Sequence, residues 1–112
     1  MAYIDGFLIP VPTANKEAYI KGAEMFEAIT KEYGALRLVD FWGDDVPEGQ
    51  LTSFPMAVKL EPGETVVMSY IEWPYKATRD AGNAKMREDP RMGPEMMPFD
   101  PRRMIFAGFV PL

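Results

Sequence analysis

The sequence contains no cysteine and no histidine among its 112 residues. Without an imidazole or a thiol, the chain has no Ser-His-Asp triad, no cysteine nucleophile, no zinc site of the cysteine–histidine type and no histidine-ligated haem. A histidine-based pH switch is excluded for the same reason. Chemistry at any site must therefore come from carboxylate, arginine, amide, hydroxyl and aromatic groups.

Long hydrophobic runs and positive charge are also scarce. No apolar run approaches the roughly 18 residues of a membrane span, and Asp5 and Gly6 interrupt the apolar N-terminal stretch. We therefore expect no signal peptide, no membrane partner and a cytoplasmic location. The 12 Lys and Arg residues against 17 Asp and Glu give a formal net charge of -5. This balance argues against nucleic-acid binding, which relies on clustered positive charge.

Length and composition predict a single globular domain over residues 1–112. The chain is 47% hydrophobic and 26% charged, which is typical of soluble globular proteins and not of disordered ones. A chain of this size buries about two-thirds of its surface on folding. That is enough for one modest core.

Hydrophobic periodicity predicts four strands and two main helices. Strands are expected at 3–11, 35–43, 65–73 and 103–110, where β-branched, aromatic and aliphatic residues predominate. Apolar residues three to four apart predict a helix between an N-cap at Asn15 and a stop at Gly34.

The middle of the chain is less regular. Pro55 argues against a central strand at 50–60, so we expect a loop there, with one helical turn or an edge strand. A second helix is predicted at 76–88, with small residues allowing close approach to the sheet: Ala77, Ala81 and Ala84. Gly82 weakens that helix by about 1 kcal/mol relative to alanine.

The order strand, helix, strand, strand, helix, strand predicts an α+β fold. It matches the ferredoxin-like βαββαβ plan, an antiparallel four-stranded sheet with two helices on one face. The open face would carry large apolar groups, and exposed patches of that kind mark interfaces. We therefore expect a homodimer through the open sheet face, which would form a dimeric α+β barrel.

Motifs along nearly the whole chain resemble the YbaA-like family of short, uncharacterised bacterial proteins. They occur in the same order and spacing: YIDGF (3–7), YGALR (33–37), DVP (45–47), RDA (79–81), NAKM (83–86), DPRM (89–92), MPFD (97–100) and RMI (103–105). The resemblance implies the dimeric α+β barrel superfamily fold and a dimer, but no substrate, cofactor or catalytic residue. Tyr75 departs from the family, in which a helix-capping serine is usual at this position.

Three carboxylates lie in predicted strands. Asp5 and Asp40 alternate with apolar neighbours, and Glu72 precedes a tryptophan, so these side chains are candidates for the barrel cavity. A desolvated carboxylate has a raised pKa and can act as a general acid or base near neutral pH. The alternative is that each carboxylate pairs with an arginine such as Arg37, Arg79 or Arg103, or faces water at the end of a strand.

Arginines form a second candidate set. Arg79 and Asn83 share one side of the second helix, and Arg91 and Arg103 follow it in the chain. An arginine fork binds a carboxylate or phosphate through two parallel hydrogen bonds, so these residues predict a site for an anionic small molecule. The alternative is a surface of salt bridges with neighbouring aspartates.

The segment 89–104 is rich in methionine. Its apolar side chains are Met92, Met96, Met97, Phe99 and Met104. They form either a soft pocket wall or, the interpretation we favour, core or dimer interface. The chain has no calcium-loop pattern, no glycine-rich phosphate loop and no dinucleotide-binding motif, so we expect no metal and no cofactor.

Two functions remain open from the sequence. In the first, the protein binds or transforms a small aromatic or carboxylated metabolite in a barrel-side pocket, and an enzyme of this kind would be a cofactor-independent oxygenase or isomerase. The catalytic candidates are Asp40, Trp42 and Asn83, and the ligand-binding candidates are Asp5, Glu72, Arg79, Arg91 and Arg103. In the second, the protein is a noncatalytic dimeric interaction module whose partner subunit buries Trp42 and the methionine-rich segment.

Overall fold

A computed structural model describes residues 3–112, in which four strands form one antiparallel sheet. The strands are β1 (Tyr3–Pro12), β2 (Arg37–Trp42), β3 (Glu64–Trp73) and β4 (Ile105–Phe109), and their order in the sheet is β2-β3-β1-β4. Every neighbouring pair is antiparallel. The α+β class and all four predicted strands are thus confirmed, with strand ends that differ by two residues at most.

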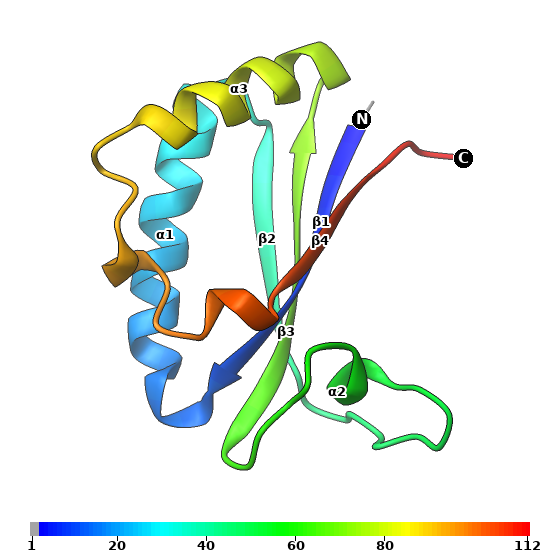
Figure 1. The fold of residues 1–112 in the computed structure, drawn as a ribbon. Helices are drawn as coiled ribbons and strands as arrows, with labels where there is room; N and C mark the ends of the chain where they lie inside the picture. Colours follow the sequence, from blue (N-terminus) through cyan, green and yellow to red (C-terminus); the bar gives the residue numbers. More distant parts are fainter. Residues whose placement is uncertain (1–2) are drawn as a thin grey trace.

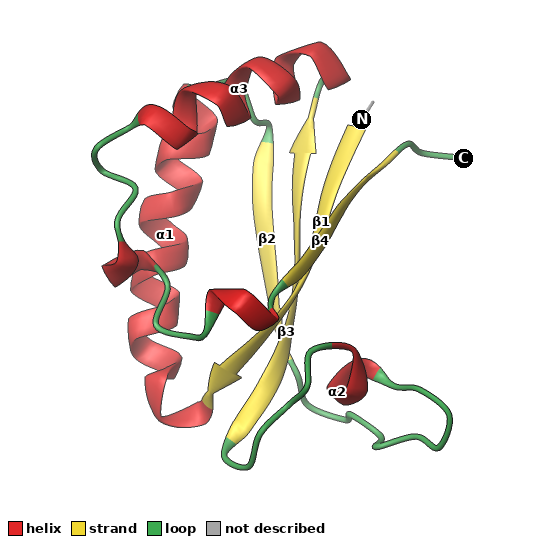
Figure 2. Cartoon of the chain, in the orientation of Figure 1, coloured by secondary structure: helices red, strands yellow, loops and turns green. Residues whose placement is uncertain are grey.

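Two long helices, α1 (Lys16–Glu32) and α3 (Lys76–Glu88), lie on the same side of this sheet (Figure 1). A single helical turn, α2 (Phe54–Ala57), lies on a loop that protrudes on the other side (Figure 2). The Ser53 hydroxyl caps α2 by accepting a hydrogen bond of 3.1 Å from the Met56 amide, so segment 50–60 contains the helical turn and not the edge strand. Among residues 3–112, no helix has both the length and the apolar content needed to cross a membrane.

The ends of α1 lie where the sequence predicts them. Gly34 follows the helix with a φ of 107°, a left-handed conformation that glycine adopts without strain. Asn15 holds the N-cap position, but its side chain does not cap the helix. It donates a hydrogen bond of 2.9 Å to the Pro98 carbonyl instead, and so ties the start of α1 to the methionine-rich segment.

The inner side of α3 differs from the predicted one. The predicted side is exposed, and it carries Ala77, Ala81 and Ala84. Gly82 and Met86 are buried instead. The fully buried ring of Trp73 occupies the space beside Gly82, where a Cβ atom would lie 2.8 Å from two ring carbons. The position therefore requires glycine because the helix backbone approaches the tryptophan closely.

The two faces of the sheet have different environments because side chains alternate along each strand. On the helix side, Ile9 and Val11 of β1 pack with Val67 of β3 in one buried cluster, and Ile71 and Trp73 belong to a second buried cluster that includes Met86 of α3. The other side carries exposed apolar residues, with 42 to 56% of their surface accessible: Phe41, Met68, Ile105 and Phe109. These four residues, together with Tyr70, are called the open face below.

Replacing Gly82 by alanine tests the close packing of α3 on Trp73. Alanine favours the helix by about 1 kcal/mol, but its methyl group must displace a buried ring, and overpacking of this kind costs about 1–3 kcal/mol. We expect urea denaturation to show a net loss of unfolding free energy. The exposed change Ala84→Gly on the same helix reports helix propensity alone, with a loss of about 1 kcal/mol. A more stable Gly82→Ala variant would contradict the packing.

Candidate functional site

Two adjoining cavities with mainly apolar walls lie on the helix side of the sheet. The tryptophan cavity, of about 330 Å³, lies between α1 and β2 and includes Trp42 in its wall. The methionine cavity, of about 220 Å³, is closed by the methionine segment, residues 89–104. Both cavities are lined by Tyr19, Ala23, Leu38 and Asp40.

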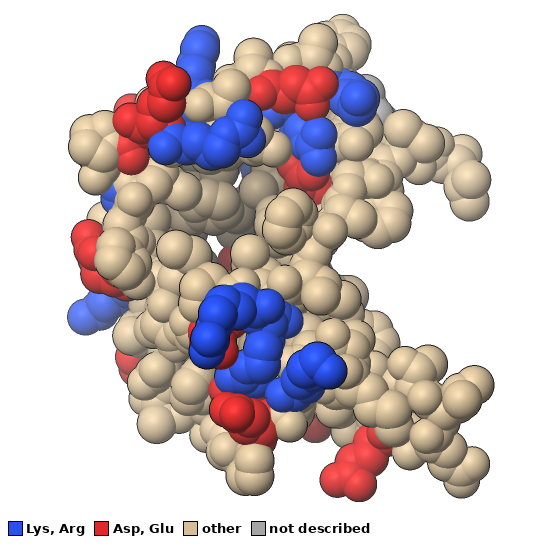
Figure 3. Space-filling view, viewed as in Figure 1, with Lys and Arg blue, Asp and Glu red and all other residues tan. Residues whose placement is uncertain are grey.

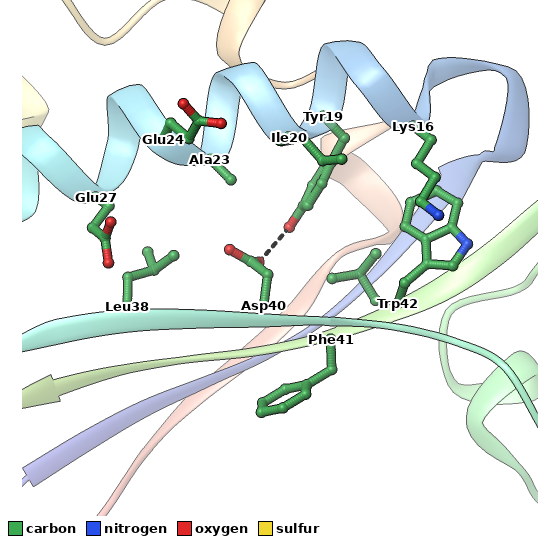
Figure 4. A pocket seen from close by; sticks show the side chains of 11 residues that line it. Lys16, Tyr19, Ile20, Ala23, Glu24, Glu27, Leu38, Asp40, Phe41 and Trp42 are labelled. Atoms are coloured by element: carbon green, nitrogen blue, oxygen red, sulfur yellow. Dashed lines mark hydrogen bonds between the residues drawn. The ribbon is translucent and has the colours of Figure 1, made fainter.

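A hydrogen bond between Tyr19 and Asp40 lies where the two cavities adjoin. The hydroxyl of Tyr19 on α1 donates to Asp40 Oδ1 on β2 at 2.7 Å (Figure 4). Tyr19 is only 7% exposed and Asp40 is half-buried. Burial, followed by the nearby Asp40 charge, raises the pKa of Tyr19 above its ordinary value of 10.0. The phenol therefore stays protonated at neutral pH and acts as a hydrogen-bond donor.

Asp40 has no cationic partner among residues 3–112. The Tyr19 hydroxyl is the one group there that forms a hydrogen bond with its carboxylate, and this bond uses Oδ1. The other oxygen, Oδ2, remains available to a ligand. The carboxylates predicted alongside it, Asp5 and Glu72, are both paired with arginines.

Asp5 lies in a buried ion pair outside both cavities. Arg79 Nη2 approaches Asp5 Oδ1 at 2.9 Å, and Trp73 Nε1 donates to Oδ2 at 3.0 Å. The Arg79 guanidinium also lies 5.0 Å from the centre of the Tyr3 ring. The alternative prediction, in which a carboxylate pairs with an arginine, therefore describes Asp5. Its contacts with Arg79 and Trp73 attach α3 to β1 and β3.

Glu72 lies on the opposite side of the sheet from Asp40. The register places it directly across from Arg37, whose Nε donates to Glu72 Oε1 at 3.1 Å. Arg37 Nη2 also donates to the Tyr70 hydroxyl at 2.8 Å. Glu72 is therefore part of a polar group at the border of the open face.

Arg91 and Arg103 form ion pairs at the two ends of the methionine segment. Arg91 contacts Asp89 at 2.7 Å and Glu32 of α1 at 2.6 Å. Arg103 donates two hydrogen bonds of 2.7 Å to Glu64 at the start of β3. Neither arginine lines the two cavities. These ion pairs hold the ends of the methionine segment against α1 and β3.

The structure brings together two of the three predicted catalytic residues. Asp40 and Trp42 both line the tryptophan cavity, where Lys16 Nζ lies 5.2 Å from the centre of the Trp42 ring (Figure 4). Asn83 lies on α3 and lines neither cavity.

Tyr19 is a site residue that was not among the candidates predicted from the sequence. A buried phenol requires a hydrogen-bond partner. A tyrosine directed toward the sheet is therefore the sequence signal that could have identified this residue.

The methionine segment forms a wall of the cavity within one chain. Met92, Met96, Met97, Phe99 and Met104 all line the methionine cavity. The segment comes close to α1 at Gly22, where a Cβ atom would lie 2.6 Å from the Met96 carbonyl oxygen. The pocket-wall interpretation therefore fits the arrangement in this chain, and burial by a partner subunit stays a prediction.

Charged side chains of both signs lie on the outer surface of the molecule. Basic and acidic side chains lie next to each other over α3 and over the lower part of the molecule on the face drawn in Figure 3. In the part of the chain that the structure describes, no group of three or more acidic side chains is arranged to hold a metal ion.

Comparison with known proteins places the chain in a family. Residues 2–101 match the family described as "Protein of unknown function (DUF1428)". The chain belongs to the DUF1428 family. Its sequence is 52% identical over 111 residues to the uncharacterized protein YbaA of Escherichia coli K12, covering 97% of this chain and 95% of that protein. The proteins of the same name from Escherichia coli O157:H7 and Shigella flexneri match with the same identity and coverage. The resemblance found in the motifs is thus confirmed, while the description of DUF1428 assigns no activity to the site.

The Glu64–Arg103 pair at one end of the methionine segment predicts a pH dependence of stability. Hydrogen bonds from Arg103 lower the pKa of Glu64 below its ordinary value of 4.5. Because the folded-state pKa is lowered, this contribution is fully present above pH 4.5 and is lost as the pH falls through the folded value. We expect Glu64→Gln to reduce unfolding free energy by about 2 kcal/mol at neutral pH, and the deficit to shrink in acid.

Urea denaturation of both proteins between neutral and acidic pH measures this effect. Asp44→Asn, an exposed change in the loop after β2, is the control and should stay within about 0.5 kcal/mol of the original chain. A Glu64→Gln deficit that is constant with pH would contradict the ion pair.

Proposed function

We propose that the protein binds a small aromatic metabolite in the two cavities beside Asp40. The observation that carries the proposal is a pair of mainly apolar cavities adjoining at a carboxylate with one oxygen free. Ligand pockets typically combine apolar walls with a few polar groups that fix orientation, and occupy about 300–1,000 Å³. The two volumes together fall within that range. Methionine side chains adapt to aromatic rings and make favourable sulfur–ring contacts.

A carboxylated metabolite is the less favoured form of the same proposal. Binding a carboxylate in a mainly apolar cavity requires a cation, and the predicted arginines Arg79, Arg91 and Arg103 are engaged in ion pairs elsewhere. Lys16 is the one basic residue that lines either cavity within residues 3–112. Its ammonium group lies against Trp42. We therefore propose an aromatic ligand without a carboxylate.

The site also contains one group suited to proton transfer. Asp40 can accept a proton from a bound ligand through Oδ2, while Tyr19 holds the carboxylate in position through Oδ1. Isomerisation or cofactor-independent oxygenation of the bound molecule is the enzymatic form of the proposal. In that form Asp40 is the catalytic base and Trp42 contributes to the cavity wall.

We further propose that two chains pair through the open face. The strand order β2-β3-β1-β4, with both long helices on one side, supports the ferredoxin-like arrangement. The exposed apolar side chains of the open face support a dimeric α+β barrel, in which a second sheet would cover them. The same dimer would serve a noncatalytic interaction module, and the two functions differ in whether the cavities bind a ligand. A cytoplasmic location remains part of the proposal.

Filling the shared part of the cavities tests ligand binding. Ala23 lines both cavities, so a phenylalanine there should occupy the space of the ligand. We expect a library of uncharged aromatic fragments, screened by thermal shift and isothermal titration calorimetry, to give ligands whose affinity falls at least about tenfold in Ala23→Phe. Ala28→Phe, on the exposed side of the same helix, should bind as the original chain does. Fragments that bind Ala23→Phe equally well would contradict the proposed site.

A charge on the open face tests the dimer. Met68 lies in the middle of this face and is 47% exposed in the single chain, so Met68→Glu would bury a charge in the proposed interface. Sedimentation equilibrium should give about twice the 12.7 kDa chain mass for the original protein and the single-chain mass for the variant. Met25→Glu, at an exposed site on α1, should stay dimeric. A monomeric original chain would overturn the dimer.

A further inference from the structure

We infer that the cavities select a cation, a small arylalkylamine whose ammonium group binds Asp40 Oδ2 while its ring enters the methionine cavity. This inference rests on the proposed function and names the chemical class of its ligand.

The carboxylate of Asp40 has no cationic partner among residues 3–112. It is half-buried and lines both cavities. Its one hydrogen bond among residues 3–112 is donated by the neutral hydroxyl of Tyr19. A partly desolvated charge without a counter-ion is unfavourable, and a bound cation relieves that cost. An ammonium group offers three N–H donors to Oδ2, whereas a ligand carboxylate would be repelled.

The charges around the opening favour the same sign of ligand. Glu24 and Glu27 line the tryptophan cavity together with Asp40, and Lys16 is the one basic residue lining it in the part of the chain that the structure describes. In Figure 4 the Glu27 side chain extends from α1 toward β2, on the side of Asp40 away from Lys16. Lys31 pairs with Glu27 at 3.8 Å, and both side chains are substantially exposed, so this pair is weak. The field at the opening therefore attracts cations and disfavours anions.

The methionine cavity fits the aromatic part of the ligand. Its volume of about 220 Å³ exceeds the roughly 150 Å³ of an apolar protein cavity that binds benzene. Phe7 and Phe99 line it together with four methionines, and among residues 3–112 Asp40 is the one charged residue in its wall. A short alkyl chain would join a ring held there to an ammonium group at Asp40, because this residue borders both cavities. The arrangement thus selects a ring and a cation in one molecule.

Calorimetric titration with three ligands of the same shape tests the inference. Phenethylamine, phenethyl alcohol and hydrocinnamate carry the same ring on a short chain and end in a cation, a neutral group and an anion. We expect the amine to bind at least about tenfold more tightly than the alcohol. Hydrocinnamate should show the weakest binding. The amine affinity should fall as salt is raised, because the attraction is electrostatic.

Variants assign the preference to one residue. In Asp40→Asn the amine should lose its advantage and bind no better than the alcohol. Asp45→Asn removes the same charge from an exposed loop position outside both cavities and should keep the preference for the amine. Circular dichroism and thermal unfolding check that each variant folds. Should Asp40→Asn fail to fold, the ligand series on the original chain still decides the sign of the charge that is preferred.

The outcomes separate this inference from the proposed function. Equal affinity for amine and alcohol, or an unchanged preference in Asp40→Asn, would overturn the selection of a cation and leave aromatic binding intact. Tighter binding of hydrocinnamate than of the amine would overturn the inference and favour a carboxylated metabolite. No binding by any of the three ligands, together with no aromatic hit in the fragment screen, would overturn both proposals.

Discussion

The alternation of side chains across the sheet is the constraint on which the rest of the structure depends. Because both long helices lie on one side, each polar side chain that a strand directs toward them must find a partner there. Asp5 meets Arg79 and Trp73, whereas the one partner of the Asp40 carboxylate among residues 3–112 is the hydroxyl of Tyr19. The first arrangement fixes α3 to the sheet. The second leaves one carboxylate oxygen facing adjoining cavities.

Much of the fold can be predicted from the local pattern of apolar and polar residues in the sequence. Strand alternation places Leu38, Asp40 and Trp42 on one side of β2, and all three line the tryptophan cavity. The helix pattern likewise places Tyr19 toward the sheet. The inner side of α3 could not be predicted, because Gly82 is buried through a contact with Trp73 and not through its own hydrophobicity. Alanine spacing therefore indicated the wrong side of the helix.

The candidate site could be predicted only in part for a related reason. The sequence shows which residues are charged but not which partner each one meets across the fold. Arg79, Arg91 and Arg103 each contact a carboxylate at 2.9 Å or less. The arginines that suggested an anion site are therefore engaged in ion pairs that connect parts of the fold. Asp40 was a candidate because of its residue type and position. Its partner Tyr19 and the cavities beside it depend on how α1 packs against β2.

We propose that the ion pairs and the cavities act together in ligand binding. Ion pairs at both ends hold the methionine segment in place, and Asn15 attaches the middle of it to α1. Methionine side chains inside this frame can adjust to a ligand without movement of the backbone. Nuclear magnetic resonance of methionine methyl groups during titration with an aromatic ligand shows whether the methionine segment contacts the ligand. We predict ring-current shifts at Met92, Met96, Met97 and Met104, with Met25 and Met68 unchanged. Shifts confined to Met68, on the open face, would contradict it.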